Sequence, residues 1–118
     1  MGLSRSKHVP AFQLSAYPPA TLPQPMWEAR AKLESSAAAI VDIRKYSDKL
    51  VVFQLNLRLA DWPTFVEYLL RSGLGVEAPN LGPTPQHANQ DGDVFGTLSV
   101  SLRSAREEIR DIVPAVPG

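Results

Sequence analysis

The segment Leu50-Val-Val-Phe-Gln-Leu-Asn-Leu-Arg-Leu59 decides the fold that we expect for this chain. The odd positions of this segment are all apolar, whereas positions 54, 56 and 58 carry Gln, Asn and Arg. Side chains of a β-strand alternate between the two faces of a sheet, so this pattern predicts a strand with one face in a core. Residues 94–103, VFGTLSVSLR, alternate in the same way and predict a second such strand.

Residues 38–46, AAIVDIRKY, predict a strand that forms a hairpin with the first one through residues 47–49. A two-residue turn would direct Arg44 into the core, whereas a three-residue turn keeps apolar side chains there. Because a slip of one residue moves every side chain to the other face, burial favours the three-residue turn. This register pairs Ile43 with Phe53, Val41 with Leu55 and Ala39 with Leu57. The turn has no glycine, so its second or third residue is expected to be left-handed.

Three helices and a short strand surround these segments. A helix is predicted from Pro25 to residue 36, since proline suits the first helical turn. A second helix begins at Asp61-Trp62-Pro63 and ends at Gly73, and a third covers residues 104–112, where Ser104 and Glu107 have the spacing of a capping box. Residues 76–78 predict a short strand at a sheet edge, and the proline-rich residues 79–92 predict a loop without regular structure.

The predicted fold is an α+β two-layer sandwich in the order ββαββα. It corresponds to a ferredoxin-like sheet in circularly permuted order, in which the strands 50–59 and 94–103 are central and adjacent. The expected division of the chain is a Pro-rich arm at 1–24, a single α+β domain at 25–113 and a tail at 114–118. Within the domain, 25–36 is an accessory helix and 37–113 the ββαββα core.

Residues 1–25 contain five of the eleven prolines, four of them in the arm, and this density predicts an extended segment without ladder pairing. The arm also contains apolar residues, so we expect Phe12 and Tyr17 to lie against folded protein, either the helix 26–34 or another subunit. The core is expected to fold without residues 1–22.

Composition excludes several classes of function. The 12 basic and 12 acidic residues give no net charge, and few exposed aromatic residues are expected, so we predict no nucleic-acid partner. No apolar run reaches the roughly 20 residues that cross a bilayer, so no membrane partner is expected. The chain has no cysteine, which fits a reducing compartment, and we expect a cytoplasmic protein. Nucleophile and phosphate-loop motifs are absent, so no catalytic residues, metal or cofactor are predicted.

Two functions follow from these patterns. The first is a small non-enzymatic module that forms a homodimer or binds a partner protein through its polar sheet face and the arm. The association candidates are Tyr46, Gln54, Asn56, Ser99, Ser101, Phe12 and Tyr17. The alternative is a small-molecule sensor or a cofactor-free enzyme with a pocket between the 79–93 loop and the sheet. Its ligand-binding candidates are His87, Asp91, Arg58 and Arg103.

Overall fold

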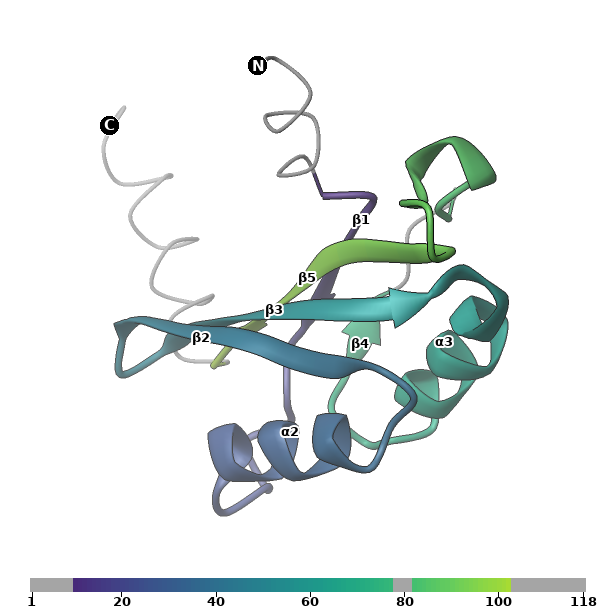
Figure 1. Cartoon of the computed structure of the whole chain (residues 1–118). Coiled ribbons are helices and arrows are strands. Elements are labelled where there is room, and N and C mark those ends of the chain that lie inside the picture. The colour runs from purple at the N-terminus through teal and green to yellow at the C-terminus, as the bar shows by residue number, and fades with distance from the viewer. Residues whose placement is uncertain (1–9, 78–81, 103–118) are drawn as a thin grey trace, which may run out of the picture.

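The computed structural model describes residues 10–77 and 82–102, and these form a mixed sheet with two helices on one face (Figure 1). The sheet has five strands in the spatial order β2-β3-β5-β1-β4 within this part of the chain. The strands are β1 (Phe12–Ala16), β2 (Ala39–Ser47), β3 (Leu50–Arg58), β4 (Val76–Glu77) and β5 (Asp93–Ser101). The helices are α2 (Pro25–Glu34) and α3 (Trp62–Leu70), and two short 3-10 turns span Leu59–Asp61 and Pro85–His87.

The two strands with strict alternation, β3 and β5, are antiparallel neighbours in the middle of the sheet, as predicted. Their helix-facing side chains fill the core, and seven apolar residues of these two strands are buried there: Val51, Phe53, Leu55, Leu57, Val94, Leu98 and Val100. The helices cover this face with Phe65 and Leu69 of α3 and with Ala29 and Leu33 of α2. The alternation of apolar and polar residues in these two segments therefore arises because one face of the sheet is buried.

The strand β1 corrects the interpretation of the arm as a segment without ladder pairing. It lies inside the sheet, parallel to β5 and antiparallel to β4, with Phe12, Leu14 and Ala16 buried. Pro10 and Pro18 flank this strand and do not interrupt it, so every residue within it keeps its backbone N–H for pairing. The core accordingly includes residues that the sequence had assigned to the arm. The α+β class is confirmed, whereas the ferredoxin-like assignment is not.

The hairpin of β2 and β3 follows the predicted register only in part. Ile43 lies opposite Phe53 as predicted, but a bulge places Ile40 opposite Leu55 and leaves Val41 60% exposed. The pairing of Val41 with Leu55 is therefore wrong, although Leu55 itself is fully buried. The pairing of Ala39 with Leu57 is also wrong, because Ala39 lies opposite Asn56.

The turn of this hairpin has two residues, because Ser47 already pairs with Leu50. A second irregularity, between Lys45 and Ser47, adds one residue to β2 next to the turn. This extra residue has the same effect on the register as the third residue of the predicted turn, so the apolar side chains stay on the core face. Among the described residues only glycines have a positive φ, so the left-handed turn residue is wrong. The Ser47 hydroxyl instead accepts a hydrogen bond from the Lys49 N–H at 3.1 Å.

The remaining expectations concern the second half of the chain. β4 lies at a sheet edge, as predicted for that short strand. The 3-10 turn at Pro85–His87 adds a regular element to the loop that was expected to have none. The predicted helix 104–112 and the tail lie outside the described residues. Within the described residues, neither helix has the length and apolar character needed to span a membrane.

Candidate functional site

His87, a predicted ligand-binding residue, takes part in a local turn. Its Nδ1 atom accepts a hydrogen bond from the Thr84 N–H at 2.9 Å and lies 3.1 Å from the Thr84 hydroxyl. The Thr84 carbonyl in turn accepts a bond from the His87 N–H. These contacts close the 3-10 turn, so one ring nitrogen of His87 already has a structural partner.

The loop then returns to the sheet through Asn89. Its Oδ1 atom accepts hydrogen bonds from the N–H groups of Asp91 and Asp93, both at 2.9 Å. Arg58 ends β3 directly opposite Asp93, so the structure brings Arg58 to the end of the loop. Arg103 lies outside the described residues. In the described ranges no three His, Asp or Glu side chains are grouped to hold a metal ion, and a ligand site at this loop stays a prediction.

The polar face of the sheet holds four of the association candidates. Gln54, Asn56, Ser99 and Ser101 project from the side of β3 and β5 that faces away from the helices, and all four are half-buried. The two arm candidates are placed differently. Phe12 is buried, with its ring centroid 4.9 Å from that of Trp62, so it presents no surface to a partner. Tyr17 is half-buried, and its N–H donates to the Gly75 carbonyl at 2.9 Å.

A surface that the sequence did not single out is the outer edge of β2. This nine-residue strand pairs with β3 on one side, and no strand of the described sheet pairs with the other side. Exposed apolar and aromatic side chains follow it, since Val41 is 60%, Ile43 38% and Tyr46 64% exposed. An edge strand presents unpaired backbone N–H and C=O groups, which can pair with another chain.

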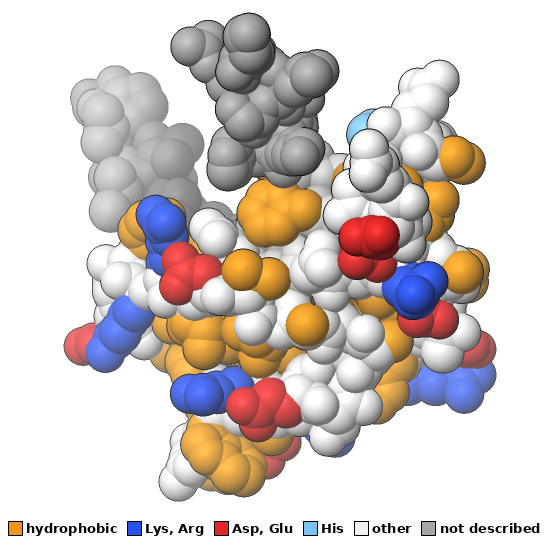
Figure 2. All heavy atoms as spheres, in the orientation of Figure 1, with side chains coloured by type: hydrophobic (Ala, Val, Ile, Leu, Met, Phe, Trp, Pro, Cys, Tyr) orange, Lys and Arg blue, Asp and Glu red, His pale blue; other side chains and the backbone are white. Residues whose placement is uncertain are grey.

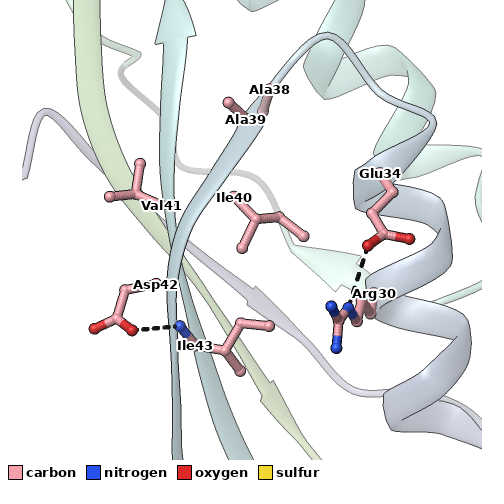
Figure 3. A pocket seen from close by; sticks show the side chains of 8 residues that line it. All are labelled: Arg30, Glu34, Ala38, Ala39, Ile40, Val41, Asp42 and Ile43. Atoms are coloured by element: carbon pink, nitrogen blue, oxygen red, sulfur yellow. Dashed lines mark hydrogen bonds and ion pairs between the residues drawn. The ribbon is translucent and has the colours of Figure 1, made fainter.

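Beside this edge, a groove of about 450 Å³ separates β2 from α2. It is lined by Arg30, Glu34, Ala38, Ala39, Ile40, Val41, Asp42 and Ile43. Ile40 and Ile43 point toward the helix, where Arg30 and Glu34 form an ion pair of 3.2 Å (Figure 3). Figure 2 shows hydrophobic side chains between β2 and α2, with charged side chains above and below them. The groove thus has an apolar floor and a charged rim.

Asp42, Ile43 and Arg44 in the middle of β2 make polar contacts with one another. The Asp42 carboxylate binds the Arg44 side chain at 3.1 Å and accepts a hydrogen bond from the Ile43 N–H at 2.9 Å. Asp42 and Arg44 lie opposite Gln54 and Val52 of β3, so both project from the polar face of the sheet. Ile43, between them, projects from the helix-bearing face.

Comparison with known proteins adds no functional information, because no family model, curated protein or solved structure matches this chain. The sequence signal for the edge was the segment IVDIRKY itself, residues 40–46. It combines apolar and charged residues without the strict alternation of β3. The predicted register placed both Val41 and Ile43 opposite core residues of the neighbouring strand, and the bulge at Val41 interrupts that register.

Proposed function

We propose that this chain is a small non-enzymatic module that acts by protein association, with the outer edge of β2 and the adjoining groove as its contact surface. The observation that carries the proposal is the nine-residue edge strand with exposed Val41, Ile43 and Tyr46. Association by strand addition uses backbone hydrogen bonds for affinity and side-chain pockets for specificity.

The groove provides the side-chain pocket that strand addition uses for specificity. A strand added along β2 directs alternate side chains to the helix-bearing face. On that face the groove offers the apolar side chains of Ile40 and Ile43, and Arg30 and Glu34 border them. An incoming apolar side chain would therefore contact an apolar surface, while its polar neighbours would meet the charged rim.

Features of β2 also restrict the pairing that it allows. Bulges at Val41 and near Tyr46 interrupt the ladder, and natural edge strands use bulges and charges to avoid indiscriminate pairing. The regular stretch between the irregularities is Asp42 to Lys45. This short ladder favours a selective and reversible contact.

Selection of peptides from a displayed library of random decapeptides tests the proposal with the full chain. We expect enrichment of extended sequences with alternating apolar residues and a loss of binding of at least tenfold in Ile43→Lys. The matched control is Leu70→Lys, because Leu70 is 53% exposed on α3, away from the β2 edge. Binding that is equal in wild type and Ile43→Lys would overturn the proposal, as would the combined absence of peptide enrichment and self-association.

A further inference from the structure

We infer that the partner of the β2 edge is a second copy of this chain, and that the two β2 strands pair antiparallel about a two-fold axis at Ile43. The inference rests on the proposed function and specifies the occupant of the edge. Isologous dimers are the commonest closed assemblies, and in them the same surface serves both subunits. Each residue of β2 must then be compatible with the β2 residue that lies opposite it in the second copy, which runs in the opposite direction.

The pleat of the sheet limits the registers of such a pair. A two-fold axis that makes two edge strands antiparallel in one continuous sheet keeps the helix-bearing faces on the same side. Directly opposite residues must therefore project from the same face. Within the regular stretch, this condition allows an axis at Asp42, at Ile43, at Arg44 or at Lys45, and it excludes an axis between two residues.

Charge distinguishes these four registers. An axis at Asp42 places two Asp42 carboxylates opposite each other. An axis at Arg44 does the same for two guanidinium groups, and an axis at Lys45 for two ammonium groups. An axis at Ile43 places Asp42 of each copy opposite Arg44 of the other, which gives two cross-strand pairs of opposite charge. Opposite charges across a strand pair are stabilising and like charges are destabilising, so the register centred on Ile43 is favoured.

The contacts that Asp42 makes within one chain can be replaced by equivalent contacts to the second copy. Asp42 already binds both the Arg44 side chain and the Ile43 N–H. In the dimer the Asp42 carboxylate would bind Arg44 of the second copy, and the Ile43 N–H would donate to the backbone of that copy. The two Ile43 side chains would then lie side by side on the helix-bearing face, next to the groove. A contact this short belongs to the class of small, transient interfaces.

Charge-reversal variants test the pairing by sedimentation equilibrium over roughly 10 µM to 1 mM, the range suited to a weak dimer. Asp42→Arg and Arg44→Asp alone should each weaken self-association at least tenfold, since every cross-strand pair becomes a like-charge pair. An equimolar mixture of the two variants should form a heterodimer, because each pair then regains opposite charges. Two variants that dimerise like wild type, or a mixture that stays monomeric, would overturn the register.

Engineered cysteines give an independent test, since the chain has none of its own. Opposite residues of an antiparallel pair have Cα atoms about 4.5–5.5 Å apart, which suits a disulfide. Ile43→Cys should therefore form a cross-linked dimer under mild oxidation. Val41→Cys is the matched control, because the two copies of residue 41 would be four residues apart along the strands, roughly 14 Å at about 3.4 Å per residue. Equal cross-linking of both variants, or none at Ile43→Cys, would contradict an axis at Ile43.

The outcomes separate this inference from the proposed function. A chain that stays monomeric at 1 mM (roughly the upper limit for a weak interface) but binds selected peptides at the β2 edge would overturn the dimer and leave the proposed function standing. A dimer that persists unchanged in Ile43→Lys would place the interface elsewhere and overturn the inferred dimer. The proposed function would fall with it if peptide binding were also unchanged in Ile43→Lys.

Discussion

Phe12 lies directly opposite Gly96 across the parallel pair of β1 and β5, and its ring occupies the space where a side chain on residue 96 would begin. A Cβ atom built on Gly96 would overlap the Phe12 ring. This close approach lets Phe12 reach α3, where its ring centroid is 6.2 Å from that of Phe65. Because Gly96 has no side chain, the Phe12 ring fits over β5 and links β1 to α3 through its contact with Phe65.

Gly96→Ala should destabilise the protein because of this overlap. We expect a loss of about 1–3 kcal/mol in the free energy of unfolding, the usual cost of overpacking a core. Without the overlap, alanine would be neutral or favourable in a strand, since glycine loses more backbone entropy on folding. Urea unfolding measures the effect, and the cost should fall by at least half in a Phe12→Leu background. An unchanged cost in that background would show that the Phe12 ring is not its cause.

Leu55→Ala should remove about 2–5 kcal/mol of stability, as expected when a fully buried leucine leaves a cavity. Leu55 lies between Ile40 of β2 and Gly96 of β5 and faces the helices. The control is Val52→Ala in the same strand, because Val52 is half-buried on the opposite face. Its effect in thermal or urea unfolding should be less than half as large, and equal losses would mean that both faces of β3 are equally buried.

Deletion of residues 1–22 should abolish cooperative unfolding, contrary to the expectation from sequence that the core folds without them. The deletion removes β1, which lies between β5 and β4, with the buried side chains of Phe12, Leu14 and Ala16, and it also removes the buried Pro18. Burial of one large apolar side chain contributes about 1.5–3 kcal/mol, a substantial part of the roughly 5–15 kcal/mol that stabilises a domain.

Circular dichroism during heating measures this effect, and deletion of residues 1–9 is its control, since it removes no described element of the sheet. A chain lacking residues 1–22 that melts at the wild-type temperature would show that β1 is dispensable.

Asn89→Ala should cost about 1 kcal/mol, because the Asp91 and Asp93 N–H groups lose a shared acceptor at the return of the loop to β5. Asn89→Asp keeps an oxygen at this position and should retain most of the stability. Gln90→Ala, at an exposed neighbouring position, serves as the second control. Amide exchange of residues 91 and 93 reports the loop directly. Unaltered exchange in Asn89→Ala would contradict this role of the side chain.

The two helices and the central strands could be predicted because their signals are local. Proline in the first turn and apolar residues at helical spacing define α2 and α3. Alternation over nine residues defines β3 and β5, whose apolar side chains face one core. The pairing of Ile43 with Phe53 followed from the same alternation, because burial favours one register.

β1 and the β2 edge were decided only in the tertiary structure. The FQLSA segment of β1 is short and lies among prolines, and its partners are about 60 and 80 residues away in the chain, so no local pattern distinguishes it from an extended arm. β2 has a local strand signal, but exposure of its outer edge follows from its place at the end of the sheet order. Apart from β1, the local sequence determined which of the described segments form the strands and α-helices, since backbone preference and periodicity act over neighbouring residues. The structure determined which strand lies inside the sheet and which at its edge, because that depends on contacts between distant segments that compete for the same backbone hydrogen bonds.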